Sequence, residues 1–205
     1  MSAPPGLREL TRRTVRSRIA ETAEEMFATE GYEATTVEAI AERVGMSKRS
    51  FFRYFASKEE VVIEHYARMG GDFLDRLAAR PLDEPEWDSL RRVFDVVAEH
   101  FADAERRERG AAMQQIVESS PALLAAYLKH MESMHHRLAE VLHERRVRRG
   151  VPVDEDRTLL RAVVGAAFCC LHATVSHVAH SPGPVDLDAR LDTVMAAVRP
   201  AHCSL

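Results

Sequence analysis

The chain has 205 residues, 46% of them hydrophobic and 29% charged, which is enough to bury a core without disulfides and excludes fibrous and disordered classes. The formal net charge of −4 excludes a uniformly basic surface, so a nucleic-acid-binding role requires a local basic patch. The three cysteines, Cys169, Cys170 and Cys203, lack the spacing of a disulfide framework and indicate a reducing compartment, so we expect a cytoplasmic protein.

The N-terminal segment is basic and then helical. Residues 1–6 contain Pro4 and Pro5 and are expected to form a frayed arm. Residues 1–18 hold five arginines and one acidic residue, Glu9. The apolar residues Ile19, Ala23 and Phe27 recur at helical spacing and predict an amphipathic first helix from about residue 10. Gly31 is expected to end this helix, because glycine readily takes the left-handed conformation found after helices.

Residues 35–58, TTVEAIAERVGMSKRSFFRYFASK, contain two short helical patterns joined by a glycine. Thr35 and Glu38 form a capping-box pattern at the start of the second helix, and Gly45 ends it. The third helix is expected from an N-cap at Ser47 to Tyr54. A small residue at the crossing (Ala41), a glycine in the turn (Gly45) and a bulky apolar residue after it (Phe51) suit a helix-turn-helix unit.

This stretch is also the basic patch, since five cations and no acid occur between Arg43 and Lys58. On the third helix, Lys48 and Arg49 are expected to reach base edges in the major groove. Their neighbours are better placed to contact phosphate, as are the free N–H groups at the starts of the second and fourth helices. The predicted DNA-binding residues are Thr36, Ser47, Lys48, Arg49, Arg53, Tyr54 and Lys58.

The rest of the chain reads as long helices without a convincing strand. We expect helices over about 58–79, 86–103, 111–119, 122–149, 154–180 and 187–198. The stretch 154–180 is the least polar, but no run of about 18 entirely apolar residues occurs, so we expect neither a membrane span nor a secretion signal.

The segment FATEGYEATTVEAIAERVGMSKRSFFRYFASKEEV, followed by an all-helical remainder, resembles the tetracycline-repressor-like (TetR) transcriptional regulators. The resemblance implies an all-α fold of about nine helices: a helix-turn-helix DNA-binding head of three helices at 1–57, and a helical effector-binding and dimerisation domain at 58–205. It also implies a homodimer formed by the last two long helices. This dimer would be a repressor on a pseudo-palindromic double-stranded operator, released by a small-molecule effector.

The chain departs from the commonest pattern of this family at two positions. Phe52 stands where many members have a phosphate-contacting tyrosine, and Tyr54 stands where many have a histidine. We therefore expect Phe52 in the core and Tyr54 as the hydroxyl contact. The segment SPALLAAYLKH at 120–130 is similar to the subgroup whose ligand domains bind acyl-CoA-like molecules.

Apolar residues of the larger domain are candidates for an effector cavity, because sites for apolar ligands are lined mainly by apolar side chains with a few polar groups. The candidates are Trp87, Phe94, Phe101, Met113, Ile116, Met131, Phe168 and His172.

The sequence leaves open a different class of function, that of a helical metal-binding or redox-sensing protein. Two sets of residues are candidates for it. Glu132/His135 and Glu140/His143 have the spacing used by di-metal carboxylate bundles, and Cys169 adjoins Cys170. The other segments contain no matching pair, so we expect no metal site. No phosphate-binding loop, GxSxG or HExxH motif occurs, so we expect that the protein binds no cofactor and is not an enzyme.

Overall fold

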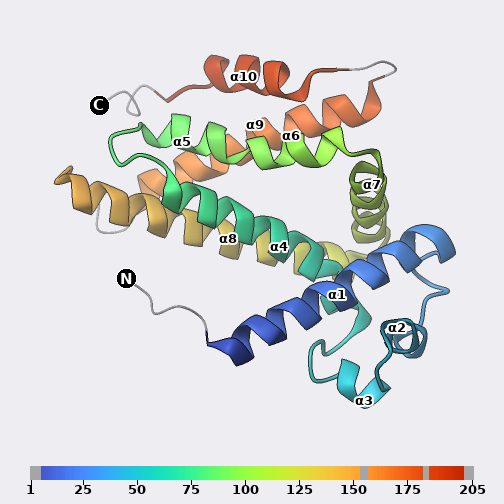
Figure 1. The fold of residues 1–205 in the computed structure, drawn as a ribbon. Coiled ribbons are helices and arrows are strands. Elements are labelled where there is room, and N and C mark those ends of the chain that lie inside the picture. Colours follow the sequence, from blue (N-terminus) through green and yellow to red (C-terminus); the bar gives the residue numbers. More distant parts are fainter. Residues whose placement is uncertain (1–5, 153–156, 182–184, 201–205) are drawn as a thin grey trace. The chain divides into compact units, whose positions relative to one another are not determined.

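The computed structural model describes residues 6–152, 157–181 and 185–200, and within these ranges the chain forms ten α-helices and no strand (Figure 1). The expected all-α fold is confirmed. The predicted arm at Pro4 and Pro5, the break at 182–184 and Cys203 lie outside the described residues. The helices are α1 (Leu7–Glu30), α2 (Val37–Val44), α3 (Lys48–Phe51), α4 (Lys58–Ala79), α5 (Glu86–Val93), α6 (Asp95–Ala102), α7 (Ala104–Ser119), α8 (Pro121–Arg149), α9 (Thr158–His180) and α10 (Leu187–Ala197).

Helices α5 to α7 differ from those expected. The single helix expected over 86–103 is divided at Phe94, whose N–H bonds to the carbonyls of both Leu90 and Arg91, so the helix is locally wound more tightly. Helix α7 begins at Ala104 and not at about residue 111, so Gly110 lies within it. A glycine costs about 1 kcal/mol in a helix, which the rest of a long helix can offset.

Local signals account for the first two helices. Ile19, Ala23 and Phe27 of α1 are buried, and Gly31 follows with φ 89°, as expected. The N-cap of α2 is Thr36 and not Thr35, because the Thr36 hydroxyl accepts a hydrogen bond from the Ala39 N–H at 3.1 Å. The predicted capping box was therefore wrong by one residue.

The helices form two compact units, which we call the first unit (Met1–Arg68 and Ala104–His130) and the second unit (Met69–Asp103 and Met131–Leu205). In the first unit, α1 packs against α2 and α7. Its buried core draws on α1, α2, α3, the start of α4, α7 and the start of α8. The boundary predicted between residues 57 and 58 separates a DNA-binding part from an effector-binding and dimerisation part, and it stays a prediction.

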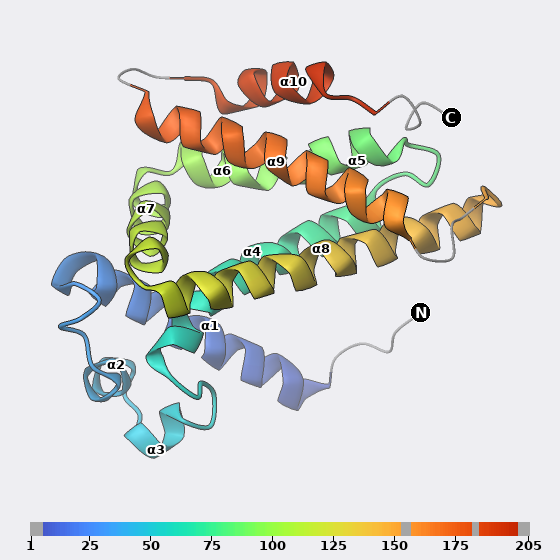
Figure 2. The ribbon, with the colours of Figure 1, turned by 180° about the vertical axis from the view of Figure 1, so that it is seen from behind.

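The second unit is organised by aromatic residues. Phe73, Phe94 and Phe168 meet edge to face, with ring centroids 5.0–5.8 Å apart. The buried Trp87 indole N–H donates to the Met195 carbonyl at 3.1 Å and so fastens α5 to α10. Helix α10 runs alongside α9 in both views of the ribbon (Figure 2).

Residues Thr158–Val178 of α9 are long and apolar enough to cross a membrane, judged by length and composition alone. The core helix of a soluble protein meets the same criterion. One side of α9 is in the core of the second unit, where it buries Leu160, Val163, Val164 and Ala167. This packing accounts for the apolar character of that side of the helix.

Candidate nucleic-acid interface and ligand pocket

The turn between α2 and α3 has the geometry that the sequence predicts. Gly45 takes the left-handed conformation, with φ 80° and ψ 36°, and the Met46 N–H closes the end of α2 on the Ala41 carbonyl at 2.9 Å. Ala41 and Phe51 are both buried. The two short helices are therefore held together by the residues expected to do so.

Helix α3 is shorter than expected. Ser47 is its N-cap, accepting from the Ser50 N–H at 3.1 Å, but regular α-helix ends at Phe51 and not at Tyr54. After Phe51, hydrogen bonds between residues three apart tighten the chain, such as the bond from the Tyr54 N–H to the Phe51 carbonyl at 2.8 Å. Phe55, which follows this tightened turn, is fully buried in the core.

The exposed face of α3 carries the cations expected to contact DNA. Lys48 is exposed, and its ammonium donates to the Glu38 carboxylate of α2, which lowers the pKa of Glu38. Arg49 is also exposed, and its guanidinium forms no hydrogen bond or ion pair with any described residue. Arg53 is exposed beside the Tyr54 ring, at 5.9 Å from its centroid. Arg49 is therefore the α3 cation that is free to meet a ligand without first breaking an ion pair.

Lys58 occupies a different environment. Its ammonium donates to the carbonyls of Tyr32 at 2.7 Å and Thr35 at 3.2 Å, and it lies 3.9 Å from the centre of the Tyr32 ring. These contacts fasten the start of α4 to the segment before α2. The phosphate contact predicted for Lys58 remains a prediction, and the geometry adds a positioning role.

Phe52 is not in the core, so that expectation was wrong. It is 47% exposed, meets the Phe51 ring edge to face and has the Lys48 ammonium 5.9 Å from its ring centroid, while Phe55 takes the buried place. Tyr54 is half-buried, and its backbone carbonyl accepts from Arg16 of α1. Thr36 and Ser47 are exposed at the starts of α2 and α3, with their hydroxyl oxygens used as caps.

The predicted effector residues are divided between the two units. Met113 and Ile116 lie in the first unit, and the other six lie in the second. Within the second unit, Trp87, Phe94 and Phe168 are buried, whereas His172 is exposed. Phe101 and Met131 pack at the margin of that core. The eight residues therefore do not line one cavity within a single unit, and their role stays a prediction.

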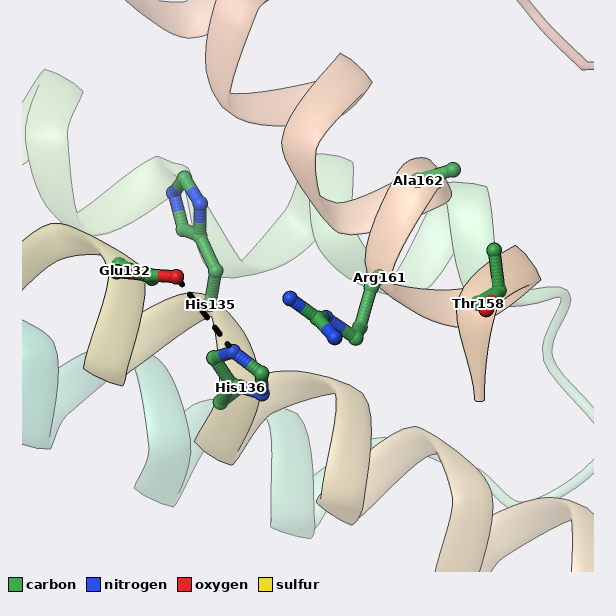
Figure 3. Close-up of a pocket in the computed structure, with 6 residues that line it drawn as sticks. All are labelled: Glu132, His135, His136, Thr158, Arg161 and Ala162. Carbon is green, nitrogen blue, oxygen red and sulfur yellow. Dashed lines mark ion pairs between the residues drawn. The ribbon is translucent and has the colours of Figure 1, made fainter. Parts of the chain in front are cut away.

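A pocket of about 450 Å³ opens between α8 and α9 within the second unit (Figure 3). Arg161 reaches from α9 toward His135 and His136 of α8 (Figure 3). The Arg161 guanidinium forms no hydrogen bond or ion pair with another side chain in the described part of the protein. The Glu132 carboxylate lies 4.0 Å from Nε2 of His136. The lining residues are Glu132, His135, His136, Thr158, Arg161 and Ala162.

His135 connects this pocket with the aromatic core. Its ring lies against Phe168, with centroids 4.5 Å apart, and its buried Nε2 has no hydrogen-bond partner among the residues that the structure describes. Burial, and then the neighbouring His136, lowers the pKa of His135, so the imidazole is neutral at physiological pH. The pocket is therefore lined by the Arg161 guanidinium, the Glu132 carboxylate and two imidazoles, one of which, His135, packs against Phe168 of the core.

Sequence reasoning named Glu132 and His135 for a metal site and missed the other four lining residues. The available signal was Arg161, an arginine in the least polar helix. The metal alternative lacks a ligand set, because among the described residues no group of three or more His, Cys, Asp or Glu side chains is placed around one ion. Glu140 instead pairs with Arg157 at 2.8 Å. Cys169 is exposed, whereas burial raises the pKa of Cys170.

Comparison with known sequences supports the interpretation of the head. Residues 19–64 match the sequence profile described as "Bacterial regulatory proteins, tetR family". The chain is 36% identical over 203 residues to the HTH-type transcriptional regulator TcmR of Streptomyces glaucescens, covering 96% of this chain and 88% of that protein. It is 27% identical over 200 residues to the HTH-type transcriptional repressor AcnR of Corynebacterium diphtheriae, covering 92% and 94%.

Solved structures share the fold. A TetR-family regulator from Mesorhizobium loti superposes with a TM-score of 0.60 at 20% identity, covering 91% of this chain and 95% of that chain. FadR of Thermus thermophilus, a TetR-family repressor in complex with lauroyl-CoA, superposes with a TM-score of 0.58 at 22% identity, covering 89% and 92%. At these identities the likeness shows the fold alone.

Proposed function

Because the chain belongs to the tetR family of bacterial regulatory proteins, we propose that it is a cytoplasmic, homodimeric repressor that a small effector releases from a pseudo-palindromic operator. The observation that carries this proposal is the helix-turn-helix unit, with Lys48 and Arg49 exposed on α3. Regulation of this kind works by binding alone and needs no catalytic step or cofactor.

In the proposed complex, α3 enters the major groove and Arg49 reads a base edge. Arginine fits this role, because its two parallel N–H groups match the O6 and N7 acceptors of guanine. Ser47, Arg53 and Tyr54 hold the phosphates on either side. Glu38 competes with DNA for Lys48, since the Lys48 ammonium must leave this carboxylate before it can contact a base.

The outward face of α9 supports a dimer. Less than half of the most apolar stretch of this helix is buried within the chain, and Ala162, Cys169 and Ala173 are exposed on it. A second copy would cover this face, in keeping with the expected bundle of the last long helices. A dimer holds its two recognition helices about one helical turn of DNA apart, about 34–36 Å.

Selection of DNA from a random-sequence pool tests the proposal directly. The full-length protein is expected to enrich an inverted repeat whose half-sites are centred about 10 base pairs, or a multiple, apart. Sequencing of the bound fraction, with a pool passed over beads alone as the control, measures the enrichment. Recovery of unrelated sequences without a repeat would contradict the proposal.

For the effector we propose a small molecule with an acidic group and an apolar body, bound in the pocket between α8 and α9. Arg161 would pair with the acid, while the His135 ring, which packs against Phe168, would contact the apolar body. Acyl-CoA-like molecules combine negative charge with an apolar chain, and the structural neighbour FadR was solved with lauroyl-CoA.

Two probes that differ in charge test whether binding in this pocket requires an acidic group. Naphthoate and its uncharged amide, naphthamide, differ mainly in charge, and calorimetry is expected to show tighter binding of naphthoate. Arg161→Gln is expected to weaken naphthoate binding about tenfold, because a hydrogen bond to a charged group is worth about 1.5 kcal/mol, and to leave naphthamide unchanged. Equal affinity of the wild-type protein for both probes would exclude an anion site here.

A further inference from the structure

Helix α1 extends well beyond the core of the first unit. It begins at Leu7, and residues 7–14 are all exposed, so about two turns, roughly 12 Å of helix, precede Val15, the first residue that packs against the core. Helices in proteins are usually stabilised by packing one face, which residues 7–14 lack. The helix carries five arginines before its first fully buried residue, Ile19: Arg8, Arg12, Arg13, Arg16 and Arg18.

Three of these arginines continue the inward face of α1. Arg8, Arg12 and Arg16 are four residues apart and form one row along the helix. Arg12 and Arg8 lie about two and three turns before Ile19, so they share the face that is apolar where α1 meets the core. The face therefore changes from apolar to basic where the helix leaves the core.

Arg16 fixes the direction of this row within the first unit. It donates to the Tyr54 carbonyl and to the Glu64 carboxylate, and its guanidinium lies 4.2 Å from the centre of the Phe55 ring. The row thus starts beside the turn after α3, next to the exposed Arg53. Arg8 and Arg12 are exposed, and neither forms an ion pair with any residue that the structure describes; Arg13 pairs with Glu9 at 3.3 Å.

We propose that Arg8 and Arg12 bind backbone phosphates of the DNA that flanks each operator half-site. The row reaches about 12 Å beyond Arg16, and one strand of DNA presents a phosphate every ~3.4 Å along the axis, so both guanidiniums can find phosphates. An anionic membrane would attract the same charges. DNA is favoured because the row begins beside Arg53 and Tyr54, the expected phosphate contacts of the head. This inference rests on the proposed function.

The test compares the wild-type protein with Arg8→Ala/Arg12→Ala on two duplexes carrying the selected operator. One ends flush with the half-sites, and the other extends about one helical turn, ~10 base pairs, on each side. The wild-type protein is expected to bind the extended duplex about tenfold more tightly, and the double variant is expected to lose this difference. The slope of log K against log salt should fall by up to about 1.8 per protomer on the extended duplex.

The control is Arg137→Ala, which removes an exposed arginine from α8 in the second unit. Circular dichroism checks folding, and alanine favours helix at both substituted positions of α1. Equal affinity of the double variant and the wild-type protein for the extended duplex would overturn the inference. So would loss of binding to anionic phosphatidylserine vesicles with DNA binding unchanged. Failure of the wild-type protein to bind the operator would instead refute the proposed function.

Discussion

Replacement of Arg49 by alanine is expected to abolish selective operator binding while the head stays folded. The Arg49 side chain is exposed and forms no hydrogen bond or ion pair within the described chain, so its loss removes no such bond from the fold. A bidentate contact with a base is worth about 1–3 kcal/mol of discrimination, and a dimer makes it twice. The preference for operator over scrambled DNA should therefore fall by about 2–6 kcal/mol, roughly 30-fold to more than 10⁴-fold.

Competition gel shifts with operator and scrambled duplexes of equal length measure this preference. Non-specific binding should change little, because it depends on phosphate contacts that remain. The matched control is again Arg137→Ala, which also removes one exposed arginine per protomer. If Arg49→Ala discriminates between the duplexes as well as the control does, Arg49 reads no base.

The largest effect on stability is expected from Arg145→Ala. Arg145 is 5% exposed and donates to the carbonyls of Leu77, Arg80 and Pro81 at 2.7–3.1 Å and to the Ser89 hydroxyl at 3.1 Å. These carbonyls lie at and after the end of α4, where a helix has no partners of its own. Loss of a buried charged partner typically costs about 3–5 kcal/mol of unfolding free energy.

Urea denaturation followed by the fluorescence of Trp87, the single tryptophan, reports on the second unit. Arg148→Ala is the control on the same helix, because Arg148 is exposed and its ion pair within the described chain is with Glu144, one turn away, at 3.7 Å. That change should alter the unfolding free energy by no more than about 0.5 kcal/mol. Coincident transitions for the two variants would show that the bonds of Arg145 contribute little.

The head illustrates how far local signals reach. Gly31 and Gly45 were placed correctly as helix ends because both need a positive φ, which glycine adopts readily, although only Gly45 takes the expected left-handed helical conformation. Ala41 and Phe51 were placed correctly because the residue spacing of a helix-turn-helix unit determines which side chains pack between its helices. Phe52 was misplaced because α3 ends at Phe51, and the tightened turn after it sends Phe55 inward instead. Periodicity alone does not reveal that change.

By itself, the sequence determined the all-α class, most helix boundaries, the helix-turn-helix unit and the family, because these depend on residues close together in the chain. Only the tertiary structure decided which charges are free. Lys48 is bound to Glu38, Lys58 to two carbonyls and Arg145 to four oxygens, whereas Arg49 and Arg161 have no such partner among the described residues. An ion pair or a pocket forms between residues distant in sequence, so the approach of two helices, and not the composition of either, determines it.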